Sequence, residues 1–105
     1  MSNYSLRILS DIKEQVYLVL PDAQVFLFGS QVRGTATEES DWDILILTQQ
    51  LVNPSLKDKL HQQLFPLSVQ SGRFINSLVV QEYDWYHNPA YYSLHQTIDK
   101  DLRRA

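Results

Sequence analysis

The order of the apolar segments is the feature that most constrains the fold of this chain. QVFLF at 24–28 and WDILIL at 42–47 are short apolar runs, which predicts two buried strands. RFINSLVV at 73–80 predicts a third strand after a glycine turn. Around these runs apolar residues recur at helical spacing. The alternation predicts an α/β (α+β) fold, with a small mixed or parallel sheet and flanking helices.

Proline residues mark the expected helix ends. Pro21 should stop a first helix, which carries Ile8, Ile12 and Val16 on one side. A helix opening at Pro54 has leucines at 56, 60 and 64 and is expected to end at Pro66. Asn88 and Pro89 should cap and start the last helix. Its apolar side would consist of Leu94, Ile98 and Leu102.

Length and composition exclude several classes of protein. A chain of 105 residues with 44% hydrophobic residues suits one domain spanning 1–105. The net charge of −3 gives no signal for nucleic-acid binding, and the absence of cysteine excludes disulfides and thiolate metal sites. No apolar run approaches the ~20 residues of a membrane helix, and the N-terminus is too polar for a signal peptide. We therefore expect a cytoplasmic protein without membrane contact. The C-terminal DKDLRRA is expected to be a solvated helix end.

Two carboxylates open the second predicted strand. Asp41 and Asp43 are separated by one residue, so both side chains point to the same face of the strand, about 7 Å apart. At this separation they can converge on one cation, and oxygen-only ligands favour a hard ion such as Mg²⁺. Without a cation the two carboxylates would repel each other. This pattern predicts a metal site.

A phosphate-binding turn is predicted just upstream. Gly29 follows a strand and lets the backbone approach a phosphate, and Ser30 begins a short helix whose free N–H groups suit an anion. Arg33 could add a guanidinium to the same phosphate; the alternative is a surface arginine paired with Glu38 or Glu39. A phosphate cradle beside a metal site is the equipment of phosphoryl or nucleotidyl transfer.

The spacing of these residues resembles a known signature. Gly29-Ser30, ten residues and then Asp41-Trp42-Asp43 is similar to the motif of the DNA polymerase β nucleotidyltransferase superfamily. FLFGSQVRGTATEESDWDILIL resembles its minimal nucleotidyltransferases, small prokaryotic proteins often encoded beside an HEPN-domain partner as toxin–antitoxin pairs. The resemblance implies a polymerase β palm-like fold, and catalytic, metal-binding roles for Asp41 and Asp43.

The same resemblance implies a substrate and partners. Gly29, Ser30 and Arg33 would bind a nucleoside triphosphate, expected to be ATP, with Mg²⁺ or alternatively Mn²⁺. The acceptor would be a hydroxyl, for example on a partner protein. Since the chain has no separate domain to read an acceptor, either an HEPN-domain partner or self-association is expected.

One carboxylate of the resembled family is missing. The expected third acid falls on Asn76, with Ser77 as the fallback, and neither side chain can act as a carboxylate base. Glu82 is the nearest acid downstream. Two functions therefore stay open: a Mg²⁺-dependent nucleotidyltransferase, or a catalytically weak nucleotide-binding antitoxin-like partner.

The remaining chemically distinctive residues have structural interpretations. The three histidines are not at metal-ligand spacing, which favours surface or packing roles. The aromatic residues of the C-terminal half are interpreted mainly as core and helix-packing residues. An exposed aromatic patch for a partner remains the alternative.

Overall fold

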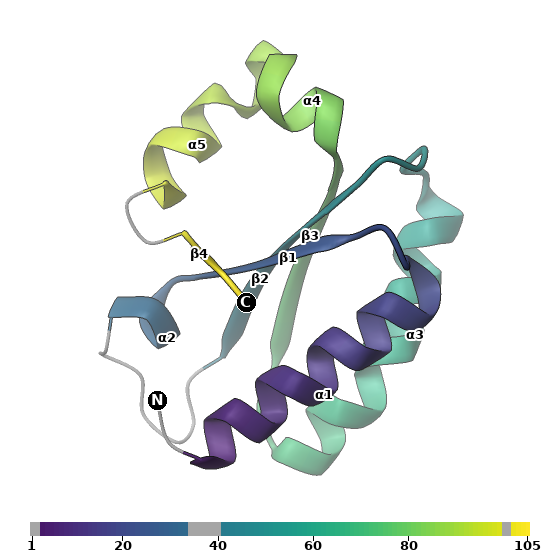
Figure 1. The fold of residues 1–105 in the computed structure, drawn as a ribbon, viewed down its shortest axis with the longest axis vertical. Helices are drawn as coiled ribbons and strands as arrows, with labels where there is room; N and C mark the ends of the chain where they lie inside the picture. The colour runs from purple at the N-terminus through teal and green to yellow at the C-terminus, as the bar shows by residue number, and fades with distance from the viewer. Residues whose placement is uncertain (1–2, 34–40, 100–101) are drawn as a thin grey trace.

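The chain folds into helices arranged around one sheet. A computed structural model describes residues 3–33, 41–99 and 102–105. The strands are β1 (Gln24–Phe28), β2 (Trp42–Thr48), β3 (Ile75–Gln81) and β4 (Arg103–Arg104). The helices are α1 (Asn3–Val19), α2 (Ser30–Arg33), α3 (Pro54–Ser71), α4 (Glu82–His87) and α5 (Tyr92–Ile98), with a 3-10 turn η1 (Pro89–Tyr91) (Figure 1). None of the helices within the described ranges is long and apolar enough to span a membrane.

The sheet is mixed, as the sequence predicts. Its strand order is β3-β2-β1-β4. β1 pairs antiparallel with β2 and with β4, whereas β2 and β3 run parallel. β1 and β2 are the inner strands, and β2 has the longer run of buried side chains.

Helices cover the two faces of the sheet separately. α1 and α3 lie side by side on one face, and α4 and α5 lie on the other (Figure 1). Trp42, Ile44 and Ile46 of β2 belong to the core under α1 and α3. Leu45 and Leu47 belong to the second core, with Trp85 and Ile98. Alternate residues of β2 therefore face opposite layers, as its strand period requires.

The prediction that α3 ends at Pro66 is wrong. The helix continues to Ser71 and closes at Gly72, which adopts a left-handed φ of 67°. A proline inside a helix costs about 3 kcal/mol because it lacks an N–H and crowds the preceding turn. Pro66 lies on the exposed side, so water can satisfy the carbonyl that loses its donor. Packing of Leu67 against the core and the Asn53 cap, which accepts from the Leu56 N–H at 2.9 Å, offset the remaining cost.

The C-terminal segment also differs from its prediction. α5 ends at Ile98, so Leu102 packs in the second core from outside the helix. Arg103 and Arg104 are not a solvated helix end but pair with β1, and the Ala105 N–H donates to the Val25 carbonyl at 2.8 Å. The physical reason is the otherwise open edge of β1, whose backbone groups need partners.

Hydrogen bonds to the Asp22 side chain connect the turn after α1 with the end of β2. Its carboxylate accepts from the Gln49 N–H at 2.7 Å and from the Thr48 hydroxyl at 3.0 Å. The Gln50 side-chain amide donates to it at 3.2 Å. Burial raises the pKa of Asp22, but these hydrogen bonds outweigh it, and the pKa lies below its usual value of 3.8. The ionised carboxylate is therefore the form that stabilises this corner.

Replacing Asp22 with asparagine should lower the free energy of unfolding by about 1 kcal/mol at neutral pH, since the charge of the acceptor is lost and one of its two oxygens is replaced by an NH₂ group that cannot accept. Because the folded pKa is depressed, this contribution is complete above pH 3.8 and disappears as pH falls through the folded pKa. Urea denaturation of both proteins across a pH series measures it. A difference between the two proteins that stays constant down to the most acidic pH would contradict this assignment.

Candidate active site

The predicted site residues meet where β1 ends and where β2 and β3 begin. In the antiparallel pair of β1 and β2, Phe28 lies opposite Asp43. In the parallel pair of β2 and β3, Asp43 lies opposite Asn76. Gly29 directly follows Phe28 and packs against the Asp43 carboxylate, so Gly29, Asp43 and Asn76 lie in one row at this edge of the sheet, although they are distant in sequence. Asp43 and Asn76 are half-buried, and Asp41 at the entrance to β2 is exposed.

Gly29 makes room for the carboxylate of Asp43. Its φ is +78°, in the left-handed region, and the residue is buried. A Cβ atom at this position would overlap Oδ2 of Asp43 and lie 3.2 Å from its Cγ. The glycine is required here because of the turn and because of the carboxylate packed against it. Its predicted approach to a phosphate remains a prediction.

We expect Gly29→Ala to destabilise the fold and to displace Asp43. The left-handed φ alone costs about 1–2 kcal/mol for alanine, and the overlap with Asp43 adds to it. Gly72→Ala is a matched control, since Gly72 has a φ of +67° but no atom lies within 4 Å of the place that its Cβ would take.

Urea denaturation and nucleotide-binding calorimetry separate the two effects. Both variants should lose stability, but only Gly29→Ala should weaken nucleotide binding. Equal binding losses in the two variants would show that the Gly29–Asp43 contact is unimportant.

Asn76 lies beside Asp43 and is bonded to it. The side-chain Nδ2 of Asn76 donates to Oδ1 of Asp43 at 3.0 Å. Ser77, the fallback position for the third acid, instead lines a small cavity under α3 on the opposite face. Glu82 begins α4 after the far end of β3, about 20 Å along the strand from Asn76. Of Asn76, Ser77 and Glu82, Asn76 is therefore the one that lies beside Asp43 in the same chain.

The short helix α2 borders the row of strands. The Gly29 carbonyl accepts from the backbone N–H groups of Val32 and Arg33 at 3.1 and 3.2 Å, which starts the helix at Ser30. The Gln31 side-chain amide donates to the Asp41 carbonyl at 3.4 Å, a link that the sequence pattern did not indicate. Arg33 is exposed in the last turn. Its alternative partners, Glu38 and Glu39, lie outside the described residues.

The donor set around Asp43 suits a hard divalent cation. Asp41 and Asp43 supply only oxygen, and the Oδ2 side of Asp43 is held against the Gly29 backbone. Across the described ranges, no three histidine, aspartate or glutamate side chains gather into a metal site. Two carboxylates alone form an incomplete shell, which water and phosphate oxygens of a bound nucleotide would complete.

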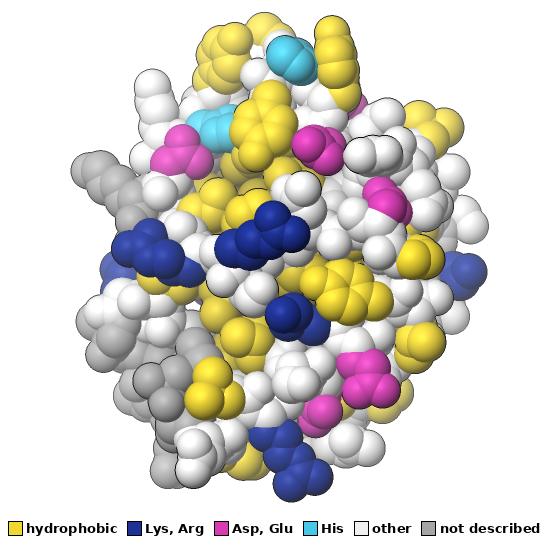
Figure 2. All heavy atoms as spheres, viewed as in Figure 1, with side chains coloured by type: hydrophobic (Ala, Val, Ile, Leu, Met, Phe, Trp, Pro, Cys, Tyr) yellow, Lys and Arg dark blue, Asp and Glu magenta, His cyan; other side chains and the backbone are white. Residues whose placement is uncertain are grey.

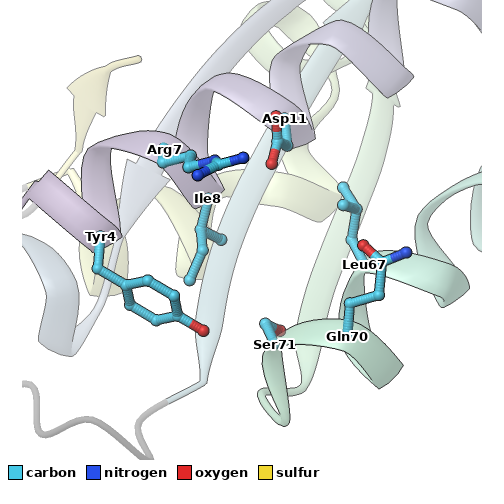
Figure 3. A pocket seen from close by; sticks show the side chains of 7 residues that line it. All are labelled: Tyr4, Arg7, Ile8, Asp11, Leu67, Gln70 and Ser71. Atoms are coloured by element: carbon cyan, nitrogen blue, oxygen red, sulfur yellow. The ribbon is translucent and has the colours of Figure 1, made fainter.

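A cavity elsewhere in the molecule does not include these residues. It has a volume of about 230 Å³ and lies between the first turns of α1 and the last turns of α3. Figure 3 shows Tyr4 and Ser71 facing each other across it, with Arg7 and Asp11 on α1. Since its lining contains neither aspartate of β2, the cavity is separate from the candidate active site.

The histidines near α4 and α5 pack against aromatic rings. The His95 Nε2 lies 2.6 Å from the Trp85 carbonyl, and the two rings are 3.9 Å apart at their centroids. The His87 ring lies 4.3 Å from that of Tyr83. These contacts agree with the predicted packing roles, while Tyr83, Tyr86 and Tyr92 stay exposed.

Comparison with known proteins gives a family match. A family model described as a nucleotidyltransferase domain matches residues 6–85. A protein of Methanocaldococcus jannaschii named "Putative protein adenylyltransferase" is 41% identical over 56 residues. That match covers 51% of this chain and 54% of the relative, so the chain spans about half the length of the curated relative it matches.

Two solved structures are similar in fold. A chain from a toxin–antitoxin crystal structure with AMP-PNP has a TM-score of 0.65 and 19% identity, over 90% of this chain and 69% of that chain. A chain from the complex of a tri-AMPylated Shewanella oneidensis HEPN toxin with its MNT antitoxin has a TM-score of 0.55 and 16% identity. That likeness covers 92% of this chain and 70% of the other. At these identities the likeness concerns the fold.

Proposed function

We propose, from the premise that this chain belongs to the nucleotidyltransferase domain family, that it transfers AMP from ATP to a hydroxyl group on a partner protein. The observation that carries this proposal is the row formed by Gly29, Asp43 and Asn76, with Asp41 at the same edge of the sheet. The row joins a turn suited to phosphate with two carboxylates suited to a divalent cation.

Gly29, Ser30, Arg33, Asp41 and Asp43 each have a proposed role. Asp41 and Asp43 would hold Mg²⁺, or alternatively Mn²⁺, and the ion would neutralise charge on the triphosphate when bound. The Gly29 backbone and the Ser30 hydroxyl would hold phosphate oxygens, and Arg33 would add positive charge. In the reaction the acceptor oxygen bonds to the α-phosphorus, the bond to the β-phosphate oxygen breaks, and pyrophosphate leaves with its electron pair.

Position 76 has no carboxylate that could take up the proton of the acceptor hydroxyl. In the position beside Asp43, the Asn76 amide is neutral and cannot take up a proton. The proton of the acceptor hydroxyl would therefore pass to solvent. We infer that transfer is slow, because general bases typically contribute about 10²–10⁴-fold in rate.

The proposed acceptor and partner rest on similar proteins. The M. jannaschii relative is named for protein adenylyl transfer, and the second solved complex contains an AMPylated HEPN toxin. An HEPN-domain protein is therefore the proposed partner of this chain. Nucleic acid is a poor candidate, because the net charge is −3 and basic and acidic side chains are interspersed on the face in Figure 2.

The neutral side chain of Asn76 favours a second function. The chain could bind ATP without efficient transfer and act as an antitoxin-like partner of an HEPN-domain protein. This function keeps the binding roles of Asp41 and Asp43 and removes the need for a base beside them. Binding without turnover, even with the partner present, would distinguish it from the first.

Isotope transfer tests the proposed activity. The chain is incubated with Mg²⁺, ATP and a purified HEPN-domain protein. Label in the α-phosphate should appear slowly on the HEPN-domain protein, and label in the γ-phosphate should not. Transfer of the γ-label would show a kinase activity instead. In a parallel reaction with tRNA we expect no labelling, and strong incorporation there would overturn the choice of a protein acceptor.

A further inference from the structure

β3 forms one edge of the sheet. Within the described residues β3 pairs with β2 alone, and it spans seven residues. The Phe74 carbonyl accepts from the Trp42 N–H at 2.9 Å, so the even-numbered residues of this strand direct their backbone groups toward β2. The N–H and C=O groups of Ile75, Ser77 and Val79 therefore point outward, because these groups alternate between the two edges of a strand.

The β3 strand lacks two features that usually keep edge strands apart. Ile75–Gln81 contains no charged residue and no proline, whereas natural edges are commonly protected by lysine, proline or a covering segment. The opposite edge of the sheet carries the short β4, which consists of two arginines. The β3 edge is thus open to another extended segment.

One face of α3 that includes an exposed phenylalanine borders the same edge. His61, Phe65 and Ser68 follow one another at helical spacing on α3, and with Phe74, Ile75 and Ser77 they line a cavity of about 60 Å³. Phe65 is 62% exposed and Phe74 is 55% exposed. Two exposed phenylalanines beside unpaired backbone groups form a surface that combines apolar contact with strand pairing.

We propose that two copies of this chain associate through β3, antiparallel about a two-fold axis, so that their sheets become continuous. A second copy fits because it presents an unpaired edge of the same length, and a two-fold interface places the same surface on both sides. The neutral strand puts no like charges opposite each other. The flanking Phe65 and Phe74 of each copy would be covered by the other.

Pairing through β3 leaves the candidate active site open. Asn76 faces Asp43 on the side of the sheet away from α3, whereas Ser77 and Phe65 line the small cavity under α3. The association therefore does not depend on the proposed chemistry, and a protein inactive in transfer could still dimerise.

Sedimentation equilibrium across a wide range of concentrations tests the association. The chain has a mass of 12.3 kDa, and we expect twice this mass at high concentration. Phe65→Lys should raise the dissociation constant of the dimer at least about tenfold, because it places a charge in the apolar contact. Leu18→Lys is the matched control, since Leu18 is 68% exposed on α1, and it should not change the constant.

Amide hydrogen exchange identifies the surface involved. In the dimer the outward amides of Ser77 and Val79 should be protected, and in Phe65→Lys they should exchange quickly. The amides of Asn76 and Leu78 point toward β2 and should stay protected in both proteins. A monomer at all concentrations, or a dimer in which the Ser77 and Val79 amides exchange quickly, would overturn the proposal.

Discussion

Asp43→Asn is expected to reduce AMP transfer at least about 10²-fold and to weaken Mg²⁺-ATP binding at least tenfold. Loss of one preorganised electrostatic group commonly costs about 10²–10³-fold in rate. Asparagine has the same shape, so its side-chain oxygen can take the place of Oδ1 and accept the Asn76 hydrogen bond, while its NH₂ group takes the place of Oδ2 beside Gly29. The fold should therefore persist, and the loss can be assigned to the missing charge. Calorimetry with and without Mg²⁺ and isotope transfer measure the two effects.

Asp58→Asn is the control for this change. Asp58 is exposed on α3, and the same substitution there removes one negative charge without touching the row of strands. Nucleotide affinity and transfer should both stay near the wild-type values. If Asp43→Asn binds Mg²⁺-ATP as tightly as Asp58→Asn does, the metal assignment at Asp43 is wrong.

Local sequence patterns predicted the central fold because its strands are short, apolar and bounded by turns. QVFLF became β1, WDILIL became β2, and alternate side chains of β2 entered different cores. The patterns failed where tertiary contacts decide. Pro66 remains inside α3 because its neighbours pack on the core, and Arg103–Arg104 become a strand because β1 offers an edge. The helix at EYDWYH lacks a clear apolar period and was not predicted.

In the candidate site, too, local sequence patterns predicted some features, while others depend on tertiary contacts. Strand period predicted a common face for Asp41 and Asp43, and this stays a prediction because β2 begins at Trp42. The family resemblance singled out position 76, and the register places Asn76 beside Asp43. The contact between Gly29 and Asp43 depends on the register between β1 and β2, which no local pattern encodes. The hydrogen bonds of Asp22 to residues 48–50 likewise join segments separated by more than 25 residues.

Asn76→Asp is expected to accelerate transfer while leaving Mg²⁺-ATP affinity near normal. The register places position 76 directly beside Asp43, so the new carboxylate would join the row. It could accept the proton that the amide cannot, and general bases contribute about 10²–10⁴-fold. The substitution also replaces the 3.0 Å hydrogen bond to Asp43 with two adjacent negative charges. Gain of activity and loss of stability should therefore arise from the same change.

Thermal unfolding separates this explanation from ordinary damage to the strand. Without a divalent cation, Asn76→Asp should be less stable than the wild type by about 1 kcal/mol, because like charges lie opposite each other. Mg²⁺ should restore most of the loss, since both carboxylates would hold the ion and it would offset their repulsion. Ser77→Asp adds the same charge on the neighbouring residue, but on the α3 side, so Mg²⁺ should not rescue its stability or its transfer rate. If Asn76→Asp is neither rescued by Mg²⁺ nor faster in transfer, position 76 does not provide the missing carboxylate of this site.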